Sequence, residues 1–207
     1  MKIISILILS FFLLFSNISS YSQQNDWQST VDIALFFFKD GNFSEALHFS
    51  LKSLEIAKKD FGEVSEPYFI SLLFISQVYS RLQDLENSIK YASLAINIAR
   101  KLYPTSEYPE GHPFLATSIN NLGFLYLEKG EYSKAEGLLE EGLQMLRNIY
   151  SKERYPEGHP DLATSINNLG LLYQEKGEYS KAEGLLEEGL QMLRNIYSKE
   201  RYPEGHP

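Results

Sequence analysis

The residues of this chain that could do chemistry are histidines, adjacent glutamates and serines. Of four histidines, His112, His159 and His206 each precede a proline in the same hexapeptide, Tyr-Pro-Glu-Gly-His-Pro. Copies one structural repeat apart lie roughly 10 Å or more from each other, so they cannot share a metal ion. His48 has no acidic residue at a recognisable ligand spacing. We interpret the first three as linker residues at helix entrances and predict no metal site.

The remaining reactive side chains also lack a catalytic arrangement. Glu140-Glu141 and Glu187-Glu188 are paired carboxylates, but neighbours on a helix point about 100° apart and cannot act together on one bond. No glycine-rich phosphate loop and no serine in a nucleophile elbow occurs. The chain has no cysteine, which excludes a disulfide framework and a thiolate nucleophile. We therefore predict a protein that is not an enzyme and needs no cofactor.

The N-terminus predicts export. Met1-Lys2 is followed by an apolar run over 3–15 and then by the small-residue pattern Ser20-Tyr21-Ser22. These are the three regions of a secretory signal peptide, which we place at 1–22. The alternatives are an uncleaved anchor or a buried helix, although the run is short for a membrane span. The expected location is periplasmic or secreted, with no membrane contact after cleavage.

The charge of the chain narrows the choice of partners. The net charge is −8 at pH 7. Removal of 1–22 takes away Lys2 as the only charged residue, so the mature chain carries −8 − 1 = −9. An acidic balance without a basic cluster argues against nucleic acid and against anionic membranes as partners. A protein or a peptide is the expected partner.

Internal repetition is the strongest signal in the sequence. Residues 112–158 and 159–205 are identical at all but three of 47 positions. The differences are Phe114 against Asp161, Phe124 against Leu171, and Leu127 against Gln174. We therefore divide the mature chain into 23–107, which is diverged, and 108–207, which holds two near-identical units and the start of a further one.

Each unit predicts two helices. Ile119, Leu122, Gly123 and Tyr126 recur at i, i+3, i+4 and i+7, the spacing of one helical stripe. This first helix, helix A of the unit, can open at Pro113 and stop near Gly130. A hairpin of two amphipathic helices buries both stripes only by stacking on the next hairpin.

The second helix, helix B of the unit, is expected to begin at Ser133. Its hydroxyl would accept from the backbone N–H of Glu136 while that carboxylate reaches back, a capping box that Ser180 and Glu183 repeat.

The unit resembles the tetratricopeptide repeat, and more specifically the kinesin-light-chain-like variety common in bacteria. The resemblance rests on Leu122-Gly123, Tyr126, Gly130, Tyr132, Ala135 and Gly142. It implies an all-α fold, a right-handed superhelical solenoid of about four antiparallel hairpins. Aligned on the small residues Ala46, Ser88, Ala135 and Ala182 of helix B, the expected hairpins cover 27–60, 66–102, 113–150 and 160–197.

The resemblance also implies a function, a scaffold that holds an extended peptide or partner protein on the concave face lined by the A helices. Residues carried over to this face from the two best units are Thr117, Asn120, Asn121, Phe124, Leu127, Glu128, Thr164, Asn167, Asn168, Leu171, Gln174 and Glu175. Amide side chains offer donors and acceptors to a peptide backbone. The alternative is that the asparagines are solvated or fill gaps between helices.

The predicted groove changes charge along its length. Lys39 and Arg81 make it basic toward the N-terminus, whereas Glu128 and Glu175 make it acidic toward the C-terminus. A clamp for a terminal carboxylate needs several cations and is not favoured.

The last predicted hairpin would expose the stripe meant for its neighbour, because no polar capping element follows it. This favours either a truncated gene or self-association through the uncapped repeat. The alternative function is the N-terminal sensing or recruiting part of a longer enzyme, a CHAT-type protease or a histidine kinase.

Overall fold

The computed structural model describes residues 22–198, and in this range it contains eight helices and no strand. The helices are α2 (Ser22–Lys39), α3 (Phe43–Phe61), α4 (Glu66–Arg81), α5 (Leu85–Leu102), α6 (Pro113–Glu128), α7 (Tyr132–Ile149), α8 (Pro160–Glu175) and α9 (Tyr179–Ile196). Apart from Ser22, which begins α2, the predicted signal peptide lies outside the described residues, as does the third hexapeptide at 202–207.

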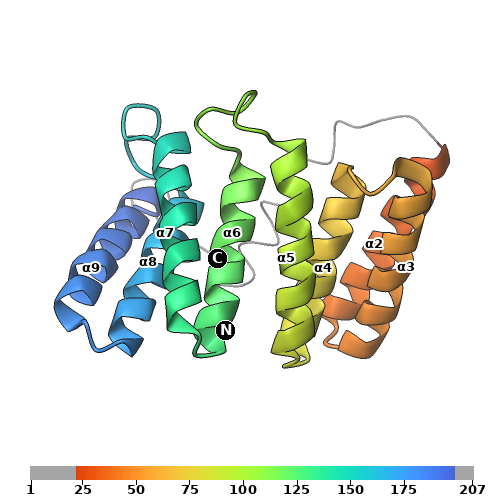
Figure 1. The fold of residues 1–207 in the computed structure, drawn as a ribbon, viewed down its shortest axis with the longest axis horizontal. Coiled ribbons are helices and arrows are strands. Elements are labelled where there is room, and N and C mark those ends of the chain that lie inside the picture. The colour runs from red at the N-terminus through yellow and green to blue at the C-terminus, as the bar shows by residue number, and fades with distance from the viewer. Residues whose placement is uncertain (1–21, 199–207) are drawn as a thin grey trace.

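The four hairpins follow one another in chain order, from α2 and α3 at one end of the row to α8 and α9 at the other (Figure 1). Each hairpin pairs helix A with helix B, and helix B then contacts helix A of the next hairpin, as α3 does α4, α5 does α6, and α7 does α8. The predicted all-α stack of four hairpins is therefore confirmed. None of the described helices combines the length and apolarity that a membrane crossing requires.

The linker hexapeptides start the A helices as predicted. His112 and His159 are the N-caps of α6 and α8, and a proline occupies the first turn of each helix. Gly130 and Gly177 have φ of 77° and 75°, a conformation that glycine adopts without steric cost, so each ends helix A and permits the tight turn to helix B.

The predicted capping boxes at Ser133 and Ser180 are wrong. The N-caps of α7 and α9 are Glu131 and Glu178, and neither makes a side-chain cap hydrogen bond. The turn between α6 and α7 ends before Ser133 is reached, because the N–H of Glu131 donates to the carbonyl of Tyr126 at 2.9 Å. The serines consequently lie inside the first helical turn.

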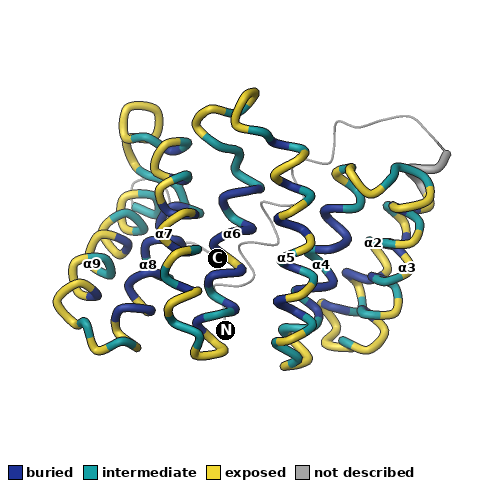
Figure 2. Tube along the Cα trace, viewed as in Figure 1, coloured by how far each residue is buried: buried dark blue, intermediate teal, exposed yellow. Residues whose placement is uncertain are grey.

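Small residues set the distance between the two helices of a hairpin. A Cβ added to Gly123 would lie 2.8 Å from Cγ of Leu139. Leu139 itself is fully buried, and Figure 2 shows buried segments in every hairpin. The close approach of the backbones lets the large side chains fill the junctions between hairpins.

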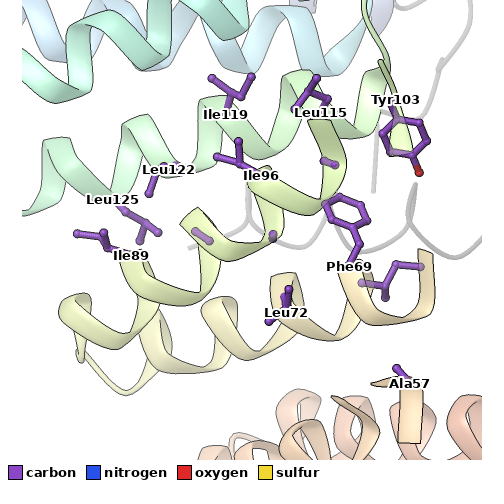
Figure 3. Close-up of a cluster of buried hydrophobic side chains, with 14 of the residues drawn as sticks. Ala57, Phe69, Leu72, Ile89, Ile96, Tyr103, Leu115, Ile119, Leu122 and Leu125 are labelled. Atoms are coloured by element: carbon purple, nitrogen blue, oxygen red, sulfur yellow. The ribbon is translucent and has the colours of Figure 1, made fainter. Parts of the chain in front are cut away.

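The largest apolar cluster joins the first, second and third hairpins (Figure 3). It includes Phe69 of α4, Ile96 of α5, and Leu115, Ile119 and Leu122 of α6. Each junction is thus a continuous core between one helix B and the helix A that follows, which holds the A helices in a fixed row.

Candidate functional site

An open groove lies between the C-terminal halves of α6 and α8. Its lining residues are Phe124, Leu127, Glu128, Lys129, Gly130, Tyr132, Leu171 and Glu175. The residues come from two A helices, from the turn that follows α6 and from the first residue of α7. The groove therefore spans the boundary between two hairpins, where one guest segment could contact both.

A stripe of accessible side chains runs along each A helix into this groove. In α6 the stripe consists of Thr117, Asn121, Phe124 and Glu128, which follow at spacings of four, three and four. Such residues share one helical face. The matching stripe of α8 is Thr164, Asn168, Leu171 and Glu175, and all eight side chains are half-buried or exposed. These eight of the twelve predicted site residues remain available to a partner.

The predicted groove role of Asn120 is wrong. Only 2% of Asn120 is exposed, and a Cβ added to Gly142 of α7 would lie 3.2 Å from the Asn120 Cβ. Asn120 precedes Gly123 by three residues, so it shares the face that packs on helix B. Its Oδ1 has no hydrogen-bond partner in the described part of the protein.

Asn167 repeats this arrangement, because its Oδ1 occupies the space where a Cβ of Gly189 would be. Both asparagines thus fill the gap between the helices of their own hairpin, which was the alternative interpretation of the sequence.

Leu127 also differs from the prediction, whereas Gln174 does not. Leu127 is buried, and it packs in the cluster that joins the third and fourth hairpins. It forms part of the groove floor and is not an accessible contact. Gln174 occupies the same position in the last hairpin and is exposed, because no further hairpin packs on α8 in the described chain.

The groove is electrostatically acidic. Lys129 is neutralised by Glu131 at 2.9 Å, and Lys176 by Glu136 at 2.8 Å. Among the described residues no ion pair engages Glu128 or Glu175. Desolvation raises the pKa of the Glu128 carboxyl above its ordinary value, as expected for a carboxylate beside apolar side chains. Two carboxylates thus border an apolar floor.

The N-terminal half of the row has a different surface. The Arg81 guanidinium lies over the rings of Phe38 and Phe43, with 5.7 and 5.4 Å to the ring centroids. Cation–π contacts of this kind hold an arginine in place while leaving its edge free to donate. The sequence identifies Arg81 as a groove residue, but not the aromatic pair that positions it.

The linker histidines have a structural role. Nδ1 of His112 accepts from the backbone N–H of Phe114 at 3.3 Å, and its ring stacks on Tyr103 with centroids 3.7 Å apart. His159 repeats the stack on Tyr150 at 3.6 Å. Burial lowers the pKa of both histidines, which favours the neutral ring that the cap requires. The interpretation as linker residues at helix entrances is confirmed for His112 and His159, while His206 lies outside the described residues.

The tyrosines that stack on these histidines are structural parts of the linker and are absent from the residues predicted above. The available signal was the tyrosine at the end of helix B, nine residues before each histidine. Across residues 22–198 no group of three or more His, Cys, Asp or Glu side chains is arranged to hold a metal ion.

Solved structures similar to this chain are helical repeat proteins. BtubC (BKLC) from P. vanneervenii matches with a TM-score of 0.71 and 20% identity, over 92% of this chain and 70% of that protein. A putative kinesin light chain with nearly identical TPR-like repeats from Podosopora anserina matches with a TM-score of 0.51 and 16% identity, over 86% and 99% of the two chains. MamA matches with a TM-score of 0.53 and 14% identity, over 84% and 81%.

These similarities establish the fold, including its likeness to the kinesin-light-chain-like variety. Comparison with curated proteins finds no match. Two family models, both described as tetratricopeptide repeat, match the sequence, one over residues 27–101 and the other over 115–161 and 162–207. Together they cover most of the chain, which accordingly belongs to the tetratricopeptide repeat family.

Proposed function

We propose that this protein is an exported, non-catalytic scaffold that holds a segment of a partner protein in the groove between α6 and α8. The observation that carries the proposal is the pair of matching accessible stripes on neighbouring A helices, which meet at the groove. Tetratricopeptide repeats generally mediate contacts between proteins. The two stripes give a partner protein a surface that is both polar and apolar and that is repeated in neighbouring hairpins.

The lining of the groove favours a partner segment with both apolar and basic side chains. An apolar side chain would bury area against Phe124 and Leu171. A lysine or arginine beside it would face Glu128 and Glu175, and a charge-assisted hydrogen bond is stronger where water is partly excluded. The amides of Asn121 and Asn168 would pair with the backbone of an extended segment.

The test is capture of partners from periplasmic or culture extract with immobilised protein. Leu171→Asp places a charge on the apolar floor, and Glu175→Lys reverses the charge of the rim. The matched control is Leu94→Asp on α5, since Leu94 and Leu171 are 43% and 39% exposed. We expect both groove variants to lose the captured protein and the control to retain it. Equal capture by all variants would place the binding surface elsewhere.

The export part of the proposal rests on the N-terminal sequence pattern alone. We expect the protein recovered from its natural source to begin at Gln23, as N-terminal sequencing would reveal. Recovery of the protein with Met1 intact would contradict cleavage, whatever the outcome of the capture experiment.

A further inference from the structure

Within residues 22–198, the two ends of the helical row carry apolar side chains that no helix of the row covers. The end formed by α9 allows an internal comparison, because α7 and α9 have the same 18-residue sequence. In α7, Leu143 is 4% exposed, whereas its counterpart Leu190 in α9 is 47% exposed. Leu139 and Leu146 are buried in α7, but their counterparts Leu186 and Leu193 are half-buried.

The difference has one structural cause. Both helices pack on helix A of their own hairpin, α6 for α7 and α8 for α9, but only α7 is also covered by the helix A of a following hairpin. That covering helix is α8, and its residues at the junction include Leu169 and Leu172, which are 5% and 0% exposed. The uncovered face of α9 therefore fits a helix A with apolar side chains at these two positions.

The first helix of the row has such side chains and leaves them exposed. Aligning the close-packing residues Ala34 and Gly170 places Ile33 and Phe36 of α2 at the positions of Leu169 and Leu172. Ile33 is 39% exposed and Phe36 is 66% exposed. They border an open hollow on α2, which is lined by Gln28, Ser29, Asp32, Ile33, Phe36 and Phe37.

We infer that a second copy of this chain is the partner of the α9 face, with α9 of one copy packed on α2 of the next in the manner of the internal junction between α7 and α8. The contact is head-to-tail, so it does not close on itself, and further copies can add in a row. The inference concerns the ends of the row and is independent of the proposed groove.

The rim charges predict that this contact is weaker than the internal one. At the internal junction Glu136 pairs with Lys176 at 2.8 Å, and Arg147 pairs with Glu188 at 3.0 Å. The same positions at the contact between copies are occupied by Glu183 opposite Asp40 and by Arg194 opposite Lys52. Both are like-charge pairs on exposed residues. Salt screens repulsion between exposed charges, so the association should tighten as salt is added.

Sedimentation velocity of the purified chain at increasing concentration tests the inference. Wild-type protein should form a concentration-dependent series of oligomers. Phe36→Glu and Leu190→Glu should each weaken the association by roughly tenfold or more, because each places a charge in the apolar contact. Leu94→Glu is the matched control, since Leu94 is 43% exposed and lies on α5, inside the row and not at either end. This variant should associate as the wild type does.

Mixing the two end variants determines the polarity of the contact. The Phe36→Glu chain keeps a free α9 face and the Leu190→Glu chain keeps a free α2 face, so together they should form a dimer and nothing larger. Undiminished self-association of the Phe36→Glu chain would indicate contact between two α9 faces and overturn the inference. A wild-type chain that stays monomeric at every concentration and salt would overturn it as well.

A variant that should associate more tightly tests the inference without disrupting the contact. The double variant Asp40→Lys, Lys52→Glu gives the first hairpin the rim charges of the fourth hairpin. Two repulsive pairs become attractive, and exposed pairs of this kind predict an association roughly fivefold tighter at low salt. Its affinity should fall with added salt, whereas that of the wild type rises. An unchanged affinity and salt dependence would contradict the inferred alignment of the two ends.

Discussion

Replacement of Gly123 by alanine tests whether the hairpin depends on close contact between its helices. A Cβ at this position would lie 2.8 Å from Cγ and 3.1 Å from the backbone nitrogen of Leu139. The obstructing atoms are close to or part of the backbone of α7, so the helices must separate. Overpacking of this kind costs about 1–3 kcal/mol, while alanine in a helix gains about 1 kcal/mol over glycine.

Gly137 in the same hairpin is the matched control. Gly137 is exposed, and a Cβ there would meet nothing within 4 Å. Gly137→Ala should therefore stabilise the protein by about 1 kcal/mol. Because both substitutions gain the same helix propensity, the difference between the two variants isolates the overpacking cost, about 1–3 kcal/mol. Urea unfolding followed by circular dichroism measures it, and equal stabilisation by both alanines would refute the close contact.

Two further predictions concern buried groups. Because burial lowers the pKa of His112 from its ordinary value of 6.5, the unfolded chain binds protons that the fold does not, and the free energy of unfolding should fall as pH drops below about 6.5. His112→Asn keeps a capping acceptor and should reduce that pH dependence in urea titrations; an unaltered slope would contradict it. Asn120→Ala removes a buried amide oxygen that has no hydrogen-bond partner among the described residues, but it also empties the gap that this side chain fills. The lost packing offsets the gains from the removed oxygen and from helix propensity, so the free energy of unfolding should change by less than about 1 kcal/mol. Partner capture should stay as in the wild type, and a loss of capture would show that Asn120 contacts the partner.

The sequence predicts the hairpins well because their signals are local. Helical spacing of apolar residues, proline at the helix start and glycine at its end each act within a few residues, so the bounds of α6 and α8 follow from Pro113, Pro160 and the glycines after each helix. The capping boxes fail because the turn closes through a backbone hydrogen bond of Glu131, which no side-chain pattern records.

The site is predicted less well than the fold. Each A helix packs against several neighbouring helices, so a residue outside the main apolar stripe can still be buried. Asn120 and Asn121 are neighbours in sequence, but only Asn121 is exposed, because Asn120 shares the packing side with Gly123. Leu127 is likewise covered at a junction between hairpins. Which residues of a stripe remain accessible depends on the position of neighbouring helices, and this information is absent from the repeat itself. The stacking of His112 on Tyr103 also requires the folded linker.

Photo-crosslinking from single positions tests the central claim most directly, that the A-helix groove holds the partner. A photoreactive phenylalanine analogue would be placed at Leu171 in the groove and, in a second protein, at Leu94 on α5, two positions of similar exposure. We predict a crosslinked partner from position 171 and none from position 94. A partner captured equally from both positions, or from position 94 alone, would contradict it.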